Sequence, residues 1–157
     1  MKPFIVPLLL LGMLLPLCAQ DSAQPAATDF QSDRCAECNM VVNNRIYAAQ
    51  IVNSGKPLFF DDIGCLVQYE RQGKVQTNAV QARFVRSVTT DAWLEVTKAV
   101  WVSTKDVRTP MGYGLHAFVD LPAAEAFARG KAGAKVLNWK DLPDLIPAKM
   151  GMGMGKK

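Results

Sequence analysis

Sulfur-bearing side chains stand close together in one short stretch of the sequence. Cys35, Cys38 and Met40 fall within six residues. Thiolate and thioether ligands together favour Cu(I), because a polarizable d¹⁰ cation matches polarizable sulfur better than it matches carboxylate or water. Further along, Cys65 follows an Asp-Asp pair and Met111 lies in a Pro/Gly-rich stretch. These five residues predict one dispersed site for a soft metal ion.

The first residues are typical of an export signal. Residues 3–17 form an apolar run behind Lys2 that is short and interrupted by proline, as in a secretory signal peptide. The run ends at Leu15-Pro16-Leu17-Cys18, which is similar to a bacterial lipobox, so Cys18 is expected to be diacylated and to become the N-terminus. Leu17 is larger than the residue usual before such a cysteine, so ordinary cleavage after Ala19 and soluble export stay open.

The rest of the chain divides into three parts. Residues 18–34 are polar and Ala/Pro-rich and are predicted to be a lipid anchor and flexible tether, and residues 35–147 are predicted to form the metal-binding domain. Residues 148–157 alternate Gly and Met and are predicted to be a flexible tail. The formal net charge is +4 and the basic residues are scattered, which argues against a nucleic-acid partner.

Export leaves several interpretations of the cysteines open. In an oxidising compartment, Cys35 and Cys38 could form a disulfide with Cys65 buried as a small apolar residue. If Cys18 carries lipid, three thiols remain, and the odd count leaves one free for metal or redox chemistry. A zinc site would need a fourth ligand, and His116 is the only imidazole in the chain. The C-x-x-C spacing also serves thiol exchange, which would make the protein an enzyme.

The other candidate ligands each have a structural alternative. Met40 could fill a gap in the core, whereas a Pro/Gly-framed loop around Met111 favours a functional role. Cys65 is expected in the first turn of a helix, where the helix dipole favours a thiolate, or as a buried thiol. His116 lies in an expected strand, where a half-buried structural role competes with ligation. An aspartate of the Asp61-Asp62 pair is expected to cap the helix rather than to act in acid–base catalysis.

The hydrophobic pattern predicts an α+β fold in one compact body, built from two small pseudo-repeats of strand, strand and helix. Each helix is expected to start behind an aspartate, at Asp61 or Asp62 in the first half and at Asp120 in the second. The expected strands are 45–52, 57–60, 84–88, 100–102, 115–119 and 136–139, and the expected helices run from 62 to about 72 and from 121 to about 129, with one further turn near 141–142.

Three motifs in order carry a resemblance to a known family. The Cys-x-x-Cys-x-Met start at 35–40, the segment Phe60-Asp61-Asp62-Ile63-Gly64-Cys65 and the segment Thr109-Pro110-Met111-Gly112-Tyr113-Gly114 resemble the NosL family of copper-binding lipoproteins that serve nitrous oxide reductase maturation. The resemblance covers about residues 35–139. The family usually has Gly where this chain has Asn39, but Asn also tolerates a left-handed backbone.

The resemblance implies two ββα halves with a fold related to that of the mercury-carbon lyases, and it supports a metal role for Met111. It also implies a Cu(I) chaperone, without enzyme activity, that delivers copper to nitrous oxide reductase or to its membrane maturation complex. Together with the export signal, this places the expected protein in the bacterial cell envelope, facing the periplasm, as a membrane-anchored lipoprotein of denitrification. The alternative is a thiol-disulfide oxidoreductase that uses Cys35 and Cys38.

Overall fold

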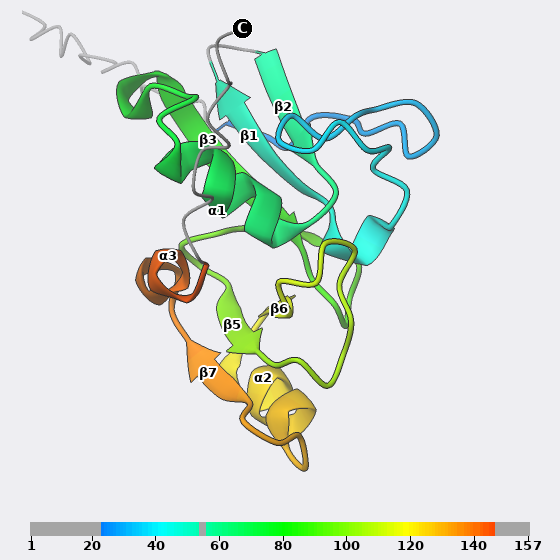
Figure 1. Ribbon diagram of the computed structural model, residues 1–157, viewed down its shortest axis with the longest axis vertical. Coiled ribbons are helices and arrows are strands. Elements are labelled where there is room, and N and C mark those ends of the chain that lie inside the picture. The colour runs from blue at the N-terminus through cyan, green and yellow to red at the C-terminus, as the bar shows by residue number, and fades with distance from the viewer. Residues whose placement is uncertain (1–22, 54–55, 147–157) are drawn as a thin grey trace, which may run out of the picture.

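Two small antiparallel sheets, each accompanied by a helix, follow one another along the long axis of the molecule (Figure 1). The computed structural model describes residues 23–53 and 56–146, so the expectations for the signal segment, for Cys18 and for the tail at 148–157 lie outside the described residues. The mixture of helices with antiparallel sheets confirms the predicted α+β class. None of the helices that the structure describes has the length and apolar character of a membrane span.

The first half is a four-stranded sheet in the order β2-β1-β3-β4 with helix α1 against it. Helix α1 begins behind Asp62 and ends at Arg71, close to the predicted bounds. Its buried residues include Ile63, Leu66 and Val67, as the pattern predicted. The elements are β1 (Ala49–Asn53), β2 (Lys56–Phe60), α1 (Ile63–Arg71), β3 (Val80–Arg86) and β4 (Trp93–Glu95).

The second half is a three-stranded sheet in the order β6-β5-β7, and helix α2 lies against it. Asp120 caps α2 by accepting a hydrogen bond from the N–H of Ala123, and Pro122 lies in the first turn, where its missing N–H leaves no intrahelical bond unmade. The elements are β5 (Val100–Ser103), β6 (Leu115–Phe118), α2 (Leu121–Ala128) and β7 (Lys135–Leu137).

The predicted pseudo-repeat is present, and the structure adds a strand to it. In the first half the strand after α1, β3, returns to pair with β1, and in the second half the strand after α2, β7, returns to pair with β5. Each half is therefore a ββαβ unit with its first strand in the centre. The registers match as well, since Ala49 faces Phe60 in one half and Val100 faces Phe118 in the other. Phe60 and Phe118 thus occupy equivalent positions, each two residues before an N-cap aspartate.

Some element bounds differ from the prediction. The expected strand from Arg45 starts instead with a 3₁₀ turn, η1 (Arg45–Tyr47), because the N–H groups of Tyr47 and Ala48 bond to carbonyls three residues back. This turn brings the Tyr47 ring into the interior. Strand β4 was not predicted. Near the C-terminal end, β7 is followed by another 3₁₀ turn, η3 (Trp139–Asp141), and by a one-turn helix, α3 (Leu142–Leu145).

Part of the segment expected to be a tether is packed on the domain. The backbone of Ala26 exchanges two hydrogen bonds with the side chain of Gln50 in β1, and the N–H of Val42 donates to the carbonyl of Asp33. The Phe30 ring packs against the core, with the guanidinium of Arg45 4.7 Å from its centre. The folded part therefore begins by Ala26, earlier than the sequence pattern indicated.

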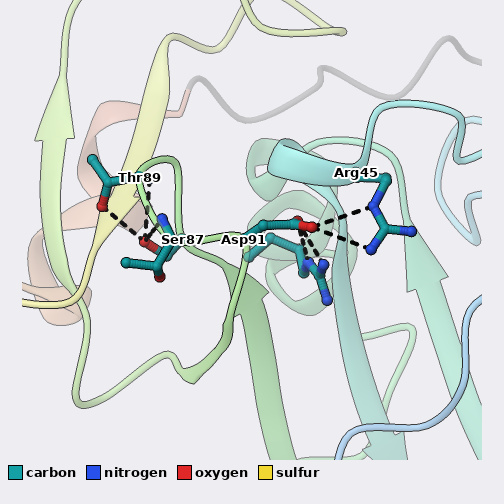
Figure 2. A network of polar contacts seen from close by, with 6 residues as sticks. Arg45, Ser87, Thr89 and Asp91 are labelled. Atoms are coloured by element: carbon teal, nitrogen blue, oxygen red, sulfur yellow. Dashed lines mark hydrogen bonds and ion pairs between the residues drawn. The ribbon is translucent and has the colours of Figure 1, made fainter.

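The loop between β3 and β4 connects the two halves. The N–H of Val88 donates to the carbonyl of Ala117 in β6. Asp91 has a left-handed backbone, with φ of 53°, and its carboxylate pairs with Arg45 at 3.2 Å and with Arg86 at 2.5 Å. Figure 2 shows Arg45 reaching Asp91 beside the Ser87–Thr89 hydroxyl contact that closes the loop. The contacts of Asp91 therefore attach the β3–β4 loop to the 3₁₀ turn η1.

Candidate metal centre

The site is built at the start of α1, where two adjacent aspartates have different tasks. Asp62 is the N-cap: its Oδ1 accepts a hydrogen bond of 2.8 Å from the N–H of Gly64. Its Oδ2 accepts a second bond, 2.9 Å long, from the backbone N–H of Met111. One carboxylate therefore starts the helix and holds the Met111 loop against it. Burial raises the pKa of Asp62, while the bonds from Thr109, Met111 and Gly64 act in the opposite direction.

The cysteine loop folds back against the edge of the first sheet. The N–H of Cys35 donates to the carbonyl of Met40, and the N–H of Asn39 donates to the carbonyl of Cys35, both at 2.8 Å. Asn39 has φ of 63°, so the left-handed turn expected at this position is present. The N–H of Ala36 donates to the carbonyl of Phe59 in β2, which places the loop beside the end of β2, next to Asp61.

These two arrangements bring four potential ligands together. The sulfur atoms of Cys35, Cys38 and Cys65 and a carboxylate oxygen of Asp61 all lie within 4.8 Å of one another. Cys35, Asp61 and Cys65 are almost fully buried, whereas Cys38 is partly exposed. The three cysteines that the structure describes are free thiols, so the alternative of a Cys35–Cys38 disulfide is not realised in this structure. Cys65 is confirmed both in the first turn of α1 and as a neighbour of the other thiols.

Their surroundings give the three thiols different pKa values. The Cys65 thiol donates to Cys35 and lowers the pKa of Cys35 to about 7, although burial opposes this. The same contact, together with burial, raises the pKa of Cys65. Burial raises the pKa of Cys38 to about 12, and its thiol donates a 3.3 Å hydrogen bond to Asp61. Cys35 is therefore the thiol that ionises first.

Both candidate methionines lie at the surface on loops attached to this cluster. Met40 is 53% exposed and Met111 is 37% exposed, so neither fills the core. The backbone of Met40 bonds to Cys35, and the backbone of Met111 bonds to Asp62, as described above. Their thioethers are thus carried by the two loops that border the buried thiols.

A close contact joins the second and third sequence motifs. A Cβ atom at Gly64 would lie 2.1 Å from two carbons of the Tyr113 side chain, so only glycine leaves room for this ring on the first turn of α1. Since Gly64 precedes Cys65 and Tyr113 follows the Met111 loop, the contact sets the distance between the thiol cluster and that loop. The glycine of the motif therefore has a positional role that its spacing alone did not reveal.

His116 lies apart from the four clustered donors, in the second half. It is fully buried in β6 and packs against two aromatic rings. The centre of its ring lies 5.6 Å from that of Tyr47 and 4.9 Å from that of Phe127. Within the described residues neither ring nitrogen makes a hydrogen bond of normal geometry. Burial, with Lys131 nearby, lowers the pKa of His116 to about 4, and the Val107 backbone opposes this only slightly. The structure therefore gives His116 a packing position and does not bring it to the cysteines.

Asp61 is the site residue that sequence reasoning missed, because helix capping explained it. The repeat contained the signal that separates the two aspartates. Phe60 is equivalent to Phe118, so Asp62 corresponds to the N-cap Asp120, and Asp61 corresponds to Val119. The second half thus begins its helix without an acid at the position of Asp61. The additional carboxylate is therefore available for the site.

Comparisons with known proteins identify the family and the fold of this chain. The family model for NosL matches residues 26–146. Among solved structures, the crystal structure of the copper chaperone NosL from Shewanella denitrificans aligns with a TM-score of 0.63 and 17% sequence identity, covering 75% of this chain and 94% of that chain. At this identity the likeness shows a shared fold. None of the curated proteins compared with the chain matches it.

Proposed function

Because this chain belongs to the NosL family, we propose that it is a copper chaperone, which binds Cu(I) and passes it to nitrous oxide reductase or to the membrane complex that matures this enzyme. The solved structure that it resembles is described as a copper chaperone. Copper is here the cargo of the protein and not a resident cofactor.

The observation that carries the proposal is the group of three free thiols. Cys35, Cys38 and Cys65 come from two distant parts of the chain, yet their sulfur atoms lie within 4.8 Å. Sulfur ligands select Cu(I) over harder ions. Cys35 supplies a thiolate near neutral pH, and the other two thiols would release protons when the ion binds.

The exposed methionines suit the transfer step. A carrier must hold the ion tightly and still release it to an incoming ligand. Met40 and Met111 carry exposed thioethers on the two loops whose backbones bond to Cys35 and Asp62, where a partner's ligand can replace them one at a time. We assign both as exchangeable ligands at the open side of the site. Release then proceeds by ligand exchange without free copper in solution.

We also propose where the protein acts and that it carries copper rather than catalysing a reaction. We propose that Cys18 carries the lipid anchor and that the protein faces the periplasm in the bacterial cell envelope. A thiol-disulfide oxidoreductase fits less well, because C-x-x-C in such enzymes accompanies a βαβ pattern. Here the motif lies in a loop before a 3₁₀ turn and a β-hairpin, with a third thiol beside it.

Anaerobic competition between the reduced protein and a Cu(I) chelator tests the proposal. We expect about one Cu(I) per chain and much weaker binding of Zn(II) and Ni(II), since the ligands are mainly sulfur. Cys35→Ser and Cys65→Ser should each weaken Cu(I) binding, while Gln81→Ala, which changes an exposed side chain of β3, should not. Equal affinity for Cu(I) and Zn(II), or turnover in a thiol-reductase assay without stoichiometric copper binding, would contradict the proposal.

A further inference from the structure

The Asp61 carboxylate is an unusual neighbour for a site that takes a soft monovalent ion. It is 2% exposed, and among the described residues no ion pair joins it to a lysine, arginine or histidine. Its side chain accepts a 3.3 Å hydrogen bond from the thiol of Cys38 and also contacts the thiol of Cys35. Buried acidic side chains in proteins are hydrogen-bonded, paired with a cation or bound to a metal ion. The group that completes the environment of Asp61 is therefore expected to be a cation held together with the thiols.

The four donors match the requirements of a tetrahedral divalent ion. Zn(II) binds three thiolates and a fourth nitrogen or oxygen ligand, and its bonds to sulfur of about 2.3 Å place tetrahedral sulfur atoms about 3.7 Å apart. The donor atoms here lie within 4.8 Å of one another, so small side-chain movements close the tetrahedron. The site is thus nearly preformed for a divalent ion.

Helix capping does not explain why residue 61 is an acid. Asp62 performs the capping of α1, and the equivalent helix α2 is capped by Asp120 with Val119 in the place of Asp61. Similarly, Ala123 stands in the place of Cys65. The second half thus forms the same strand–helix connection without the acid or the thiol. The carboxyl group of Asp61 is therefore not required for this part of the fold.

We propose that Asp61 is a specificity-determining residue, the fourth ligand that allows the cluster of Cys35, Cys38 and Cys65 to hold Zn(II) in a closed tetrahedral site. This rests on the proposed function in that the same thiols carry copper. Cu(I) uses the sulfur atoms alone, since a carboxylate oxygen is a poor ligand for it. Asp61 thus sets how strongly the site discriminates between the two ions, without contributing to Cu(I) affinity.

The test compares Zn(II) and Cu(I) binding by the reduced protein and its Asp61→Asn variant. The amide keeps the size of the side chain and removes the anionic ligand. We expect Zn(II) affinity to fall by at least about 10- to 100-fold, while Cu(I) affinity changes by less than about threefold. Asp144→Asn is the matched control, because it makes the same change at an exposed position of α3, and it should leave the affinity for Zn(II) within about threefold of the parent.

Two spectroscopic measurements on the wild-type protein keep the test decisive if Asp61→Asn does not fold. Co(II) should give the intense visible bands of tetrahedral coordination, and the chemical shift of bound ¹¹³Cd should indicate three sulfur ligands and one oxygen ligand. Octahedral Co(II), a ¹¹³Cd shift without an oxygen ligand, or a folded Asp61→Asn variant that binds Zn(II) as tightly as the parent would overturn the inference. Because Cu(I) is titrated separately, loss of Cu(I) binding would refute the chaperone proposal alone.

Discussion

Replacing His116 with Leu should remove an acid-sensitive weakness of the fold and leave copper binding unchanged. The His116 side chain is fully buried between two aromatic rings, and its pKa is lowered to about 4. Leu occupies the equivalent position in the first half, because Leu58 lies two residues before Phe60 just as His116 lies two residues before Phe118. The substitution is therefore compatible with the repeat.

The magnitude follows from proton linkage. In the unfolded chain the imidazole takes up a proton near its ordinary pKa of 6.5, but in the folded chain only near 4. As the pH falls from about 7 towards 4, the unfolded state binds more protons, so the free energy of unfolding decreases. A tenfold difference in proton affinity corresponds to about 1.4 kcal/mol, so the full loss through His116 is about 3 kcal/mol. Above about pH 7 the imidazole is neutral in both states and this effect vanishes.

The assay is urea unfolding of the reduced, metal-free protein, followed by tryptophan fluorescence at several pH values between 7 and 4. The difference in unfolding free energy between His116→Leu and the parent should grow by about 3 kcal/mol in favour of the variant over this range. Asp62, whose pKa is raised by burial, acts in the opposite sense but equally in both proteins, so it cancels in the difference.

A second measurement on the same variant concerns the site. His116 is not among the four donors that lie within 4.8 Å of one another, so the Cu(I) affinity of His116→Leu at pH 7 should equal that of the parent. Parallel pH profiles for the two proteins would refute the burial argument. A large loss of Cu(I) affinity in a folded variant would show instead that His116 acts as a ligand.

Three further predictions concern the loops and the anchor. Met111→Leu should weaken Cu(I) binding while changing the unfolding free energy by less than about 1.5 kcal/mol. The remaining Cu(I) affinity should depend on pH as it does in the parent, because a thioether has no proton to lose. Unchanged Cu(I) affinity would show that Met111 is not a ligand. Gly64→Ala forces a Cβ to within 2.1 Å of the Tyr113 side chain and should destabilise the fold by about 1–3 kcal/mol in urea unfolding. Adding Tyr113→Ala should recover part of that loss, and strict additivity of the two changes would argue against the clash. Cys18→Ser should release the protein from the membrane fraction with unchanged Cu(I) affinity, and a parent protein found wholly in the soluble periplasm would contradict lipidation.

Much of the architecture could be predicted because its signals are local. The N-cap aspartates, the apolar stripe of α1 and the alternating strands are properties of short segments, and they placed both helices to within a few residues. Strand β4 and the 3₁₀ turn η1 were missed because they depend on tertiary contacts: β4 has three residues paired with β3, and η1 turns Tyr47 into the interior. Short segments of this kind carry too little periodicity to be recognised.

The chemistry available to this protein can be identified from its residue types alone: soft sulfur ligands in C-x-x-C-x-M, a third cysteine behind an Asp-Asp pair, and a methionine in a Pro/Gly-framed loop. Which of these groups meet depends on the three-dimensional fold. The C-x-x-C loop reaches Cys65 because its backbone bonds to the edge of β2, and Asp61 turns to the thiols because Asp62 takes the helix cap. His116 is equally available in the sequence, yet the register of β6 directs it to a different part of the core. Residue type is a local property, whereas proximity depends on strand pairing between distant segments, which no spacing in the chain specifies.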